Sequence, residues 1–138
     1  MRRQNSHFGG VLFAVIAVIV LTVLIVIYAS KNNFTKEYAN YVKTYEDAFL
    51  EYANKDLPSD YSIVYDYDEL TDVLISKGYL TKFSDSSVEI SSNPITFEKT
   101  NNKVSFYNYN NSTTLENRFE LLFKKGNKEY TCTKIECR

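Results

Sequence analysis

The chain has 138 residues, with 16 Lys and Arg against 17 Asp and Glu, a formal net charge of −1 and 44% hydrophobic residues. This length excludes a multi-domain chain and a multi-span transporter. The apolar residues are concentrated in residues 11–30, where 18 of 20 side chains are apolar and none is charged. Such a segment also excludes an ordinary cytosolic globular enzyme.

Residues 11–30 are long enough to cross a bilayer as a helix. At about 1.5 Å per residue they span roughly 30 Å, the thickness of the hydrocarbon core. They predict a transmembrane helix. The sequence Ile27-Tyr28-Ala29 leaves open a secretory signal peptide cleaved after Ala29. Because the apolar region of a signal peptide has only about 7–15 residues, the transmembrane helix is favoured.

The flanking charges indicate how this helix is oriented. Residues 1–10 form a short leader that holds Arg2 and Arg3 and no acidic residue, although lysines follow the span as well. The short basic leader favours a cytoplasmic N-terminus. We therefore expect a single-pass protein of the cell membrane, with the lipid bilayer as a partner and residues 31–138 as an extracytoplasmic α+β domain.

Residues 33–54 predict an amphipathic helix, since apolar side chains recur every three or four residues. The stripe consists of Phe34, Tyr38, Tyr41, Val42, Tyr45, Ala48, Phe49 and Tyr52. No Pro or Gly separates this helix from the span, so one long helix over residues 11–54 is expected. The stripe either covers the protein's own sheet or packs against other copies. The sequence favours the first alternative, and both can hold together.

A short strand and a second helix are expected next. Pro58 ends the long helix, and residues 61–65 (YSIVY) predict a strand. Asp66 is typical of a helix N-cap and Gly78 of the position after a helix end, which predicts a helix over residues 67–77.

The remaining sequence predicts antiparallel strands. They are expected over residues 87–91, 95–99, 103–109, 117–124 and 128–133, with turns at residues 100–102 and 125–127. A meander of four strands is the simplest topology. The predicted fold class is therefore α+β, in which a long N-terminal helix, first transmembrane and then amphipathic, packs on a small antiparallel sheet.

The two cysteines, Cys132 and Cys137, are separated by five positions. In an extended chain their Cα atoms would lie about 16 Å apart, whereas a disulfide needs roughly 4.4–6.8 Å. A disulfide therefore requires that residues 133–136 turn back. Two free thiols are the alternative, and an oxidising compartment favours the disulfide.

Residues with catalytic or metal-binding chemistry are scarce. The acidic cluster of Asp66, Asp68, Glu69 and Asp72 lacks the glycine and the distal glutamate of a calcium loop, so its acids are expected to complement a helix dipole. No histidine follows His7 to serve as a base or zinc ligand. We predict no enzymatic activity, no catalytic residue, no metal, no cofactor and no small-molecule substrate.

Two further expectations concern partners. Residues 31–138 hold 14 basic and 17 acidic side chains, and phosphate backbones would repel such a domain, so no nucleic-acid contact is expected. Residues 107–112 (YNYNNS) are either an exposed aromatic binding surface or a strand that runs into an Asn-rich turn. The strand is favoured.

The order of these features resembles type IV pilins and the pseudopilins of type II secretion. The resemblance lies in the basic leader ending in Gly9-Gly10, the uncharged span, the amphipathic continuation, the segment 68–80 (DELTDVLISKGYL), the sheet and the C-terminal cysteines. It implies leader cleavage between Gly10 and Val11 and a C-terminal disulfide loop. Val15 stands where the family has Glu at the fifth mature position.

The resemblance implies a function as well. It predicts a non-enzymatic, pilin-like structural subunit of a surface filament or of a secretion or DNA-uptake pseudopilus. The partners would be further copies or other pilin-like subunits, contacted through the long helix. The alternative is a single-pass anchored protein whose small extracytoplasmic domain binds another partner.

Overall fold

The computed structural model describes the backbone of residues 2–138 and the side chains of residues 11–25 and 35–138. The chain divides into two compact units, Met1–Phe34 and Thr35–Arg138, which are considered separately below. The elements are α1 (Arg2–Asp56), β1 (Tyr61–Tyr65), α2 (Tyr67–Ser76), β2 (Glu89–Ser91), β3 (Ile95–Thr100), β4 (Lys103–Tyr107), β5 (Tyr109–Asn111), β6 (Glu116–Arg118), β7 (Leu121–Lys125) and β8 (Lys128–Cys132).

The prediction of a transmembrane helix is wrong for this structure. Among the residues whose side chains are described, no helix is both long enough and apolar enough to cross a membrane. Residues 26–30, which complete the predicted span, lie outside the described side chains.

Two related predictions are also wrong. The predicted location was the cell membrane, as a single-pass protein with a cytoplasmic N-terminus and an extracytoplasmic domain, and it depended on a spanning helix that the described residues do not contain. The predicted fold class is also wrong, because the part of α1 whose side chains are described holds no membrane-spanning helix and the described strands form three sheets, not one.

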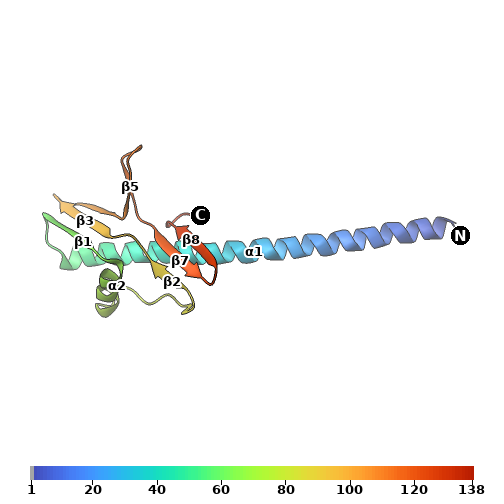
Figure 1. The fold of residues 1–138 in the computed structure, drawn as a ribbon, viewed down its shortest axis with the longest axis horizontal. Helices are drawn as coiled ribbons and strands as arrows, with labels where there is room; N and C mark the ends of the chain where they lie inside the picture. Colours follow the sequence, from blue (N-terminus) through green and yellow to red (C-terminus); the bar gives the residue numbers. More distant parts are fainter. Residues whose placement is uncertain (1) are drawn as a thin grey trace. The chain divides into compact units, whose positions relative to one another are not determined.

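Residues 35–56 of α1 form the centre of the second unit. The predicted apolar stripe is buried from Tyr38 to Tyr52, as the spacing of three and four residues requires, while Phe34 lies outside the described side chains. Figure 1 shows the β1–β3–β4 sheet near the end of α1 at Asp56 and the β2–β7–β8 sheet nearer residue 35. The helix therefore covers the protein's own sheets.

Aromatic rings join this helix to both sheets. Tyr38 stacks on Phe123 of β7 with ring centroids 4.3 Å apart, and Phe49 stacks on Phe106 of β4 at 4.0 Å. All of these rings except Phe106 are almost fully buried. An aromatic ring buries more apolar area than an aliphatic side chain. A small domain can therefore form its core from tyrosine and phenylalanine side chains.

The C-terminal end of α1 is capped from β3. Lys99 is buried, and its Nζ donates hydrogen bonds to the carbonyl oxygens of Ala53 (3.4 Å) and Leu57 (3.3 Å). The last carbonyl groups of a helix lack partners within the helix and carry partial negative charge, so a buried lysine is favourable there.

The short elements after α1 agree with their predictions. β1 has the expected bounds, and α2 begins at Tyr67 and ends at Ser76, with Lys77 as its C-cap. Asp66 is the N-cap in position, although its side chain forms no capping hydrogen bond. Gly78 has φ +82°, the left-handed conformation in which only glycine is free of strain, and so it ends the helix.

The predicted four-stranded meander is wrong. Within the described residues the strands form three sheets, in the orders β1–β3–β4, β2–β7–β8 and β5–β6. The segment predicted as one strand over residues 117–124 is divided between β6 and β7, and the segment over residues 103–109 is divided between β4 and β5. Asn108 lies between β4 and β5, and its side chain pairs with the backbone of Glu120, which lies between β6 and β7.

Candidate functional site

The C-terminal cysteines form a disulfide-closed loop. Cys132 and Cys137 are bonded, with their Cα atoms 4.0 Å apart, which confirms the predicted pairing. The amide of Thr133 donates to the carbonyl of Glu136 at 2.8 Å, so residues 133–136 turn back as the spacing required. Beyond the loop, Arg138 and Thr131 exchange both backbone hydrogen bonds, at 2.9 and 3.0 Å. The chain end is therefore held against β8.

Three contacts hold this loop against the rest of its unit. The Cys137 Sγ lies 3.2 Å from the carbonyl oxygen of Thr35, at the start of the described part of α1 in this unit. Lys134 lies 3.8 Å from a carboxylate oxygen of Glu46. Arg138 pairs with Glu120 at 3.1 Å. The loop thus presents a fixed surface.

The tip of the loop is an exposed apolar residue. Ile135 is 82% exposed, next to Lys134, whose side chain is 57% exposed. Elsewhere in the second unit, Leu115 is equally exposed, in the turn between β5 and β6, where it has φ +57°.

The segment over residues 107–112 belongs to β4 and to the hairpin of β5 and β6, as the strand interpretation expected.

A groove of about 370 Å³ lies beside α2. Its lining has an apolar group, Tyr41, Tyr67, Ile75, Phe83, Val88 and Ile90, and a polar group, Asp68, Thr71, Asp72, Lys82, Asp85 and Ser86. The polar group includes three carboxylates and one lysine. The groove therefore combines apolar walls with a net negative charge.

The carboxylates of the groove differ in their partners. Asp85 accepts hydrogen bonds from Lys125 at 2.7 Å and from the Ser87 hydroxyl at 2.6 Å, which lower its pKa to about 2. Asp68 and Asp72 form no ion pair with any residue whose side chain is described. Their charges are therefore available to a group that enters the groove.

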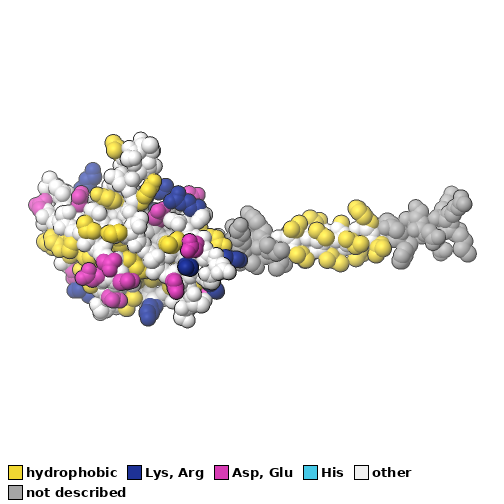
Figure 2. Space-filling model, viewed as in Figure 1, with side chains coloured by type: hydrophobic (Ala, Val, Ile, Leu, Met, Phe, Trp, Pro, Cys, Tyr) yellow, Lys and Arg dark blue, Asp and Glu magenta, His cyan; other side chains and the backbone are white. Residues whose placement is uncertain are grey.

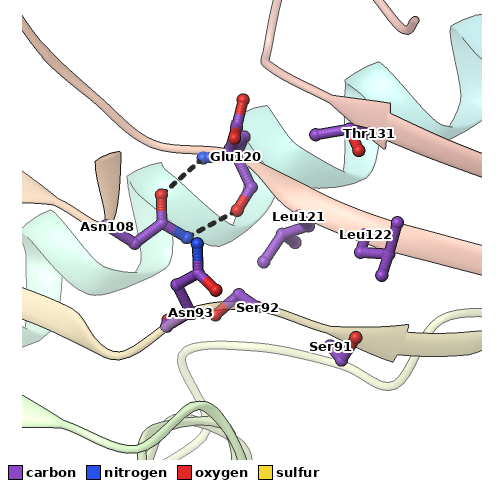
Figure 3. Close-up of a pocket in the computed structure, with 8 residues that line it drawn as sticks. All are labelled: Ser91, Ser92, Asn93, Asn108, Glu120, Leu121, Leu122 and Thr131. Carbon is purple, nitrogen blue, oxygen red and sulfur yellow. Dashed lines mark hydrogen bonds between the residues drawn. The ribbon is translucent and has the colours of Figure 1, made fainter. Parts of the chain in front are cut away.

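A second, smaller cavity of about 220 Å³ lies at the end of β2. Figure 3 shows the Asn108 side chain directed at Glu120, with its amide and carbonyl groups both bonded to the Glu120 backbone, at 2.6 and 3.0 Å. The other polar side chains around the cavity are those of Ser91, Ser92, Asn93, Thr131 and Glu120. Since the nitrogen and the oxygen of the Asn108 amide both bond to the Glu120 backbone, this cavity lies at a structural junction between the strands.

Burial shifts the pKa values of Tyr38 and of the half-buried Glu46. Burial raises the pKa of Tyr38 to about 12, with further increases from the charges of Asp85 and Glu37. Burial also raises the pKa of Glu46, while Lys134 acts to lower it and Asp47 to raise it. Glu46 lies on α1 beside the disulfide loop, and the sequence pattern alone gave no sign of this contact.

Among the residues with described side chains, no group of three or more His, Cys, Asp or Glu side chains could hold a metal ion. The acidic residues at the start of α2 lie along its first turns, where they complement the helix dipole.

The predicted leader site lies at the edge of the described residues. Gly10 falls outside the described side chains, and Val11, the first residue inside them, is 52% exposed. Cleavage between Gly10 and Val11 stays a prediction.

Residues 11–25 are apolar and exposed on every side of the helix. The large apolar side chains from Val11 to Ile25 are between 50% and 75% exposed, and Figure 2 shows them as a continuous apolar stretch. Monomeric soluble proteins rarely expose apolar patches larger than a few hundred Å². A helix that is hydrophobic all round needs partners that cover it.

Comparison of the chain with protein-family models, with curated proteins and with solved structures found no match.

Proposed function

We propose that this protein is a non-enzymatic, pilin-like structural subunit that assembles with further copies or with other pilin-like subunits. The observation that carries the proposal is the exposed apolar helix of residues 11–25. Helices of this kind pack against one another through interdigitating side chains and so remove their apolar surface from water.

The second unit supports the same proposal. The 35–56 stretch of α1 is covered by strands, and a disulfide closes the C-terminal loop, which is the arrangement that the resemblance to pilins implies. The proposal therefore assigns two roles to α1. Residues 11–25 provide the contact between subunits, and residues 35–56 provide the core of the folded unit.

Sedimentation velocity of the full chain tests the proposal. We expect the unmodified protein to form assemblies that grow with concentration. A variant with Val15→Asp and Ile19→Asp places two charges on one face of the apolar stretch and should sediment as a monomer, because burying unpaired carboxylates is costly.

The control is Val64→Asp on β1, since Val64 is similarly exposed, at 62%, but lies in the other unit. This variant should assemble like the unmodified chain. A monomeric unmodified chain, or equal assembly of the Val15→Asp, Ile19→Asp variant, would contradict the proposal.

A further inference from the structure

We infer that the C-terminal tail, residues 133–138, covers a sheet edge at which two copies of this chain otherwise pair, and that the disulfide holds this cover in place. The edge is the outer side of β8, and the strand that the tail excludes is β8 of a second copy. The inference concerns the second unit alone, so it goes beyond the proposed function and does not depend on residues 11–25.

The tail is bonded to β8 as a further antiparallel segment. β8 is the last strand in the order β2–β7–β8, so its outer side is an edge of the described sheet. On that side Thr131 and Arg138 exchange both backbone hydrogen bonds, and Cys132 and Cys137 form an antiparallel bridge. Figure 1 shows the C-terminus next to β8. The edge therefore accepts an extended segment, and the segment that occupies it is the chain's own tail.

The tail covers only part of this edge. The backbone groups of an antiparallel strand point alternately to one side and to the other. Since Thr131 bonds outward to the tail, Glu129, two positions earlier, also directs its N–H and C=O groups outward. Its side chain is 58% exposed. With the tail in place, Glu129 is the one outward-facing residue of β8 that stays uncovered, which is too few for a second strand to pair with.

Without the tail, β8 can pair with itself. The edge then offers the N–H and C=O groups of both Glu129 and Thr131. Two copies related by a two-fold axis can place Glu129 of each strand opposite Thr131 of the other, with the two Tyr130 residues opposite each other. This register keeps like charges from facing each other and pairs two aromatic side chains, and both features stabilise neighbouring strands. Unprotected strand edges associate in this way.

The disulfide determines how firmly the edge is covered. The Cys132–Cys137 bond ties the tail to β8 covalently, while Arg138 adds an ion pair with Glu120 at 3.1 Å. When a dithiol reduces this bond, two electrons and two protons pass to the protein, two cysteine thiols form, and the dithiol becomes a disulfide. The tail is then held by its hydrogen bonds and ion pairs alone, so the edge opens more often.

Sedimentation velocity of a shortened chain tests the inference. The shortened chain ends at Thr133 and carries Cys132→Ala, so that no tail and no free thiol remain. It is compared with the full-length chain, both in the background of Val15→Asp and Ile19→Asp, which is designed to remove association through the apolar helix. The shortened chain should dimerise about tenfold more tightly or better, because two outward-facing residues of β8 are then free.

A full-length chain without the disulfide is the matched control. With Cys132→Ala and Cys137→Ala it keeps the tail, and its dimerisation should lie between those of the other two chains. The same chain supplies the measurement if the shortened one does not fold, which thermal unfolding would show. Treatment of the unmodified chain with a dithiol should reproduce its behaviour.

A proline substitution identifies the edge that pairs. Proline lacks a backbone N–H and is tolerated where that group of an edge strand faces solvent. Glu129→Pro should leave the thermal transition of the full-length chain nearly unchanged and should weaken dimerisation of the shortened chain about tenfold or more. Glu129→Ala, which keeps the N–H, should leave dimerisation nearly unchanged.

Amide hydrogen exchange gives a readout that association elsewhere does not move. In the full-length chain the Thr131 amide should exchange slowly, because it is bonded to Arg138 at 3.0 Å, and the Glu129 amide should exchange fast. In the shortened chain, protection of the Glu129 amide should rise with protein concentration.

The outcomes separate this inference from the proposed function. Opened chains that fold and stay monomeric, or a Glu129 amide whose exchange is independent of concentration in them, would overturn the inference. Dimerisation that Glu129→Pro does not weaken would place the contact elsewhere and overturn it as well. An unmodified chain that never assembles would contradict only the function proposed above.

Discussion

The hydroxyl of Tyr45 lies 2.8 Å from the hydroxyl of Thr71, and this hydrogen bond joins α1 to α2. The Tyr45 ring stacks on Tyr67 and on Phe119, with centroid distances of 5.7 and 5.5 Å. Thr71 also lines the groove. The helix that forms the core of the second unit therefore also positions one wall of this groove.

Replacing Tyr45 by Phe should lower the free energy of unfolding by about 1 kcal/mol, because the ring remains while its hydrogen bond to the half-buried Thr71 hydroxyl is lost. Urea denaturation measures this loss. Tyr109→Phe, at an exposed tyrosine of β5, should change stability by less than about 0.5 kcal/mol. Equal stability of the Tyr45→Phe variant and the unmodified protein would show that the bond contributes nothing.

Lys99→Met should destabilise the second unit by about 1–3 kcal/mol. The substitution keeps an unbranched side chain of similar length, but it removes the donors to the carbonyl groups of Ala53 and Leu57 at the end of α1. Lys103→Met, at an exposed position of β4, is the matched control and should be nearly neutral. Thermal unfolding of both variants checks the prediction, which fails if the two shifts are the same.

The contribution of Glu46 to the stability of the folded unit should fall as the pH rises. Burial raises its pKa, so the folded state holds this proton more tightly than the unfolded state does. The resulting stabilisation is present below the pKa of the unfolded chain and is lost as the pH rises through the raised pKa. Lys134 and Asp47, the charged neighbours, act in opposite directions.

Glu46→Gln should therefore gain stability relative to the unmodified protein as the pH rises. Urea denaturation at about pH 3.5 and about pH 8, on either side of the ordinary glutamate range, measures the difference. A difference in free energy of unfolding that is independent of pH, or that favours the unmodified protein more strongly at high pH, would contradict this assignment.

Reduction of the Cys132–Cys137 bond should lower the free energy of unfolding by about 2 kcal/mol, the chain-entropy value for so short a loop. Amide exchange at Thr131 and Thr133 should accelerate, because both amides are bonded within the structure that the disulfide closes. Cys132→Ala with Cys137→Ala should reproduce the effect without reductant. Unchanged exchange at both amides would show that the loop is held by its other contacts alone.

The sequence predicts elements whose cause is local. The stripe from Tyr38 to Tyr52 is buried because helical spacing alone places those side chains on one face. Gly78 ends α2 because glycine adopts the left-handed conformation there without strain. The disulfide follows from a short separation that a turn can close.

Features that depend on distant contacts are not predictable in this way. The strands divide at Asn108 and Glu120 because the Asn108 amide replaces backbone pairing between residues 12 positions apart. The alternation of apolar residues along the sequence does not indicate such a pairing. The pairs Glu46–Lys134 and Lys99–Ala53 likewise join segments that are far apart in the chain. The groove forms only when α2 packs beside Phe83 and β2.

The central claim is that residues 11–25 become buried between subunits, and a cysteine introduced by Ile19→Cys tests it most directly. Its rate of reaction with a water-soluble maleimide is measured in dilute and in assembled protein, with Val64→Cys as the matched control, since both native side chains are similarly exposed. We predict that assembly slows the reaction at position 19 by about tenfold or more and leaves position 64 unchanged, because a thiol packed between helices is shielded from water. Equal rates at position 19 in dilute and concentrated protein would contradict the account.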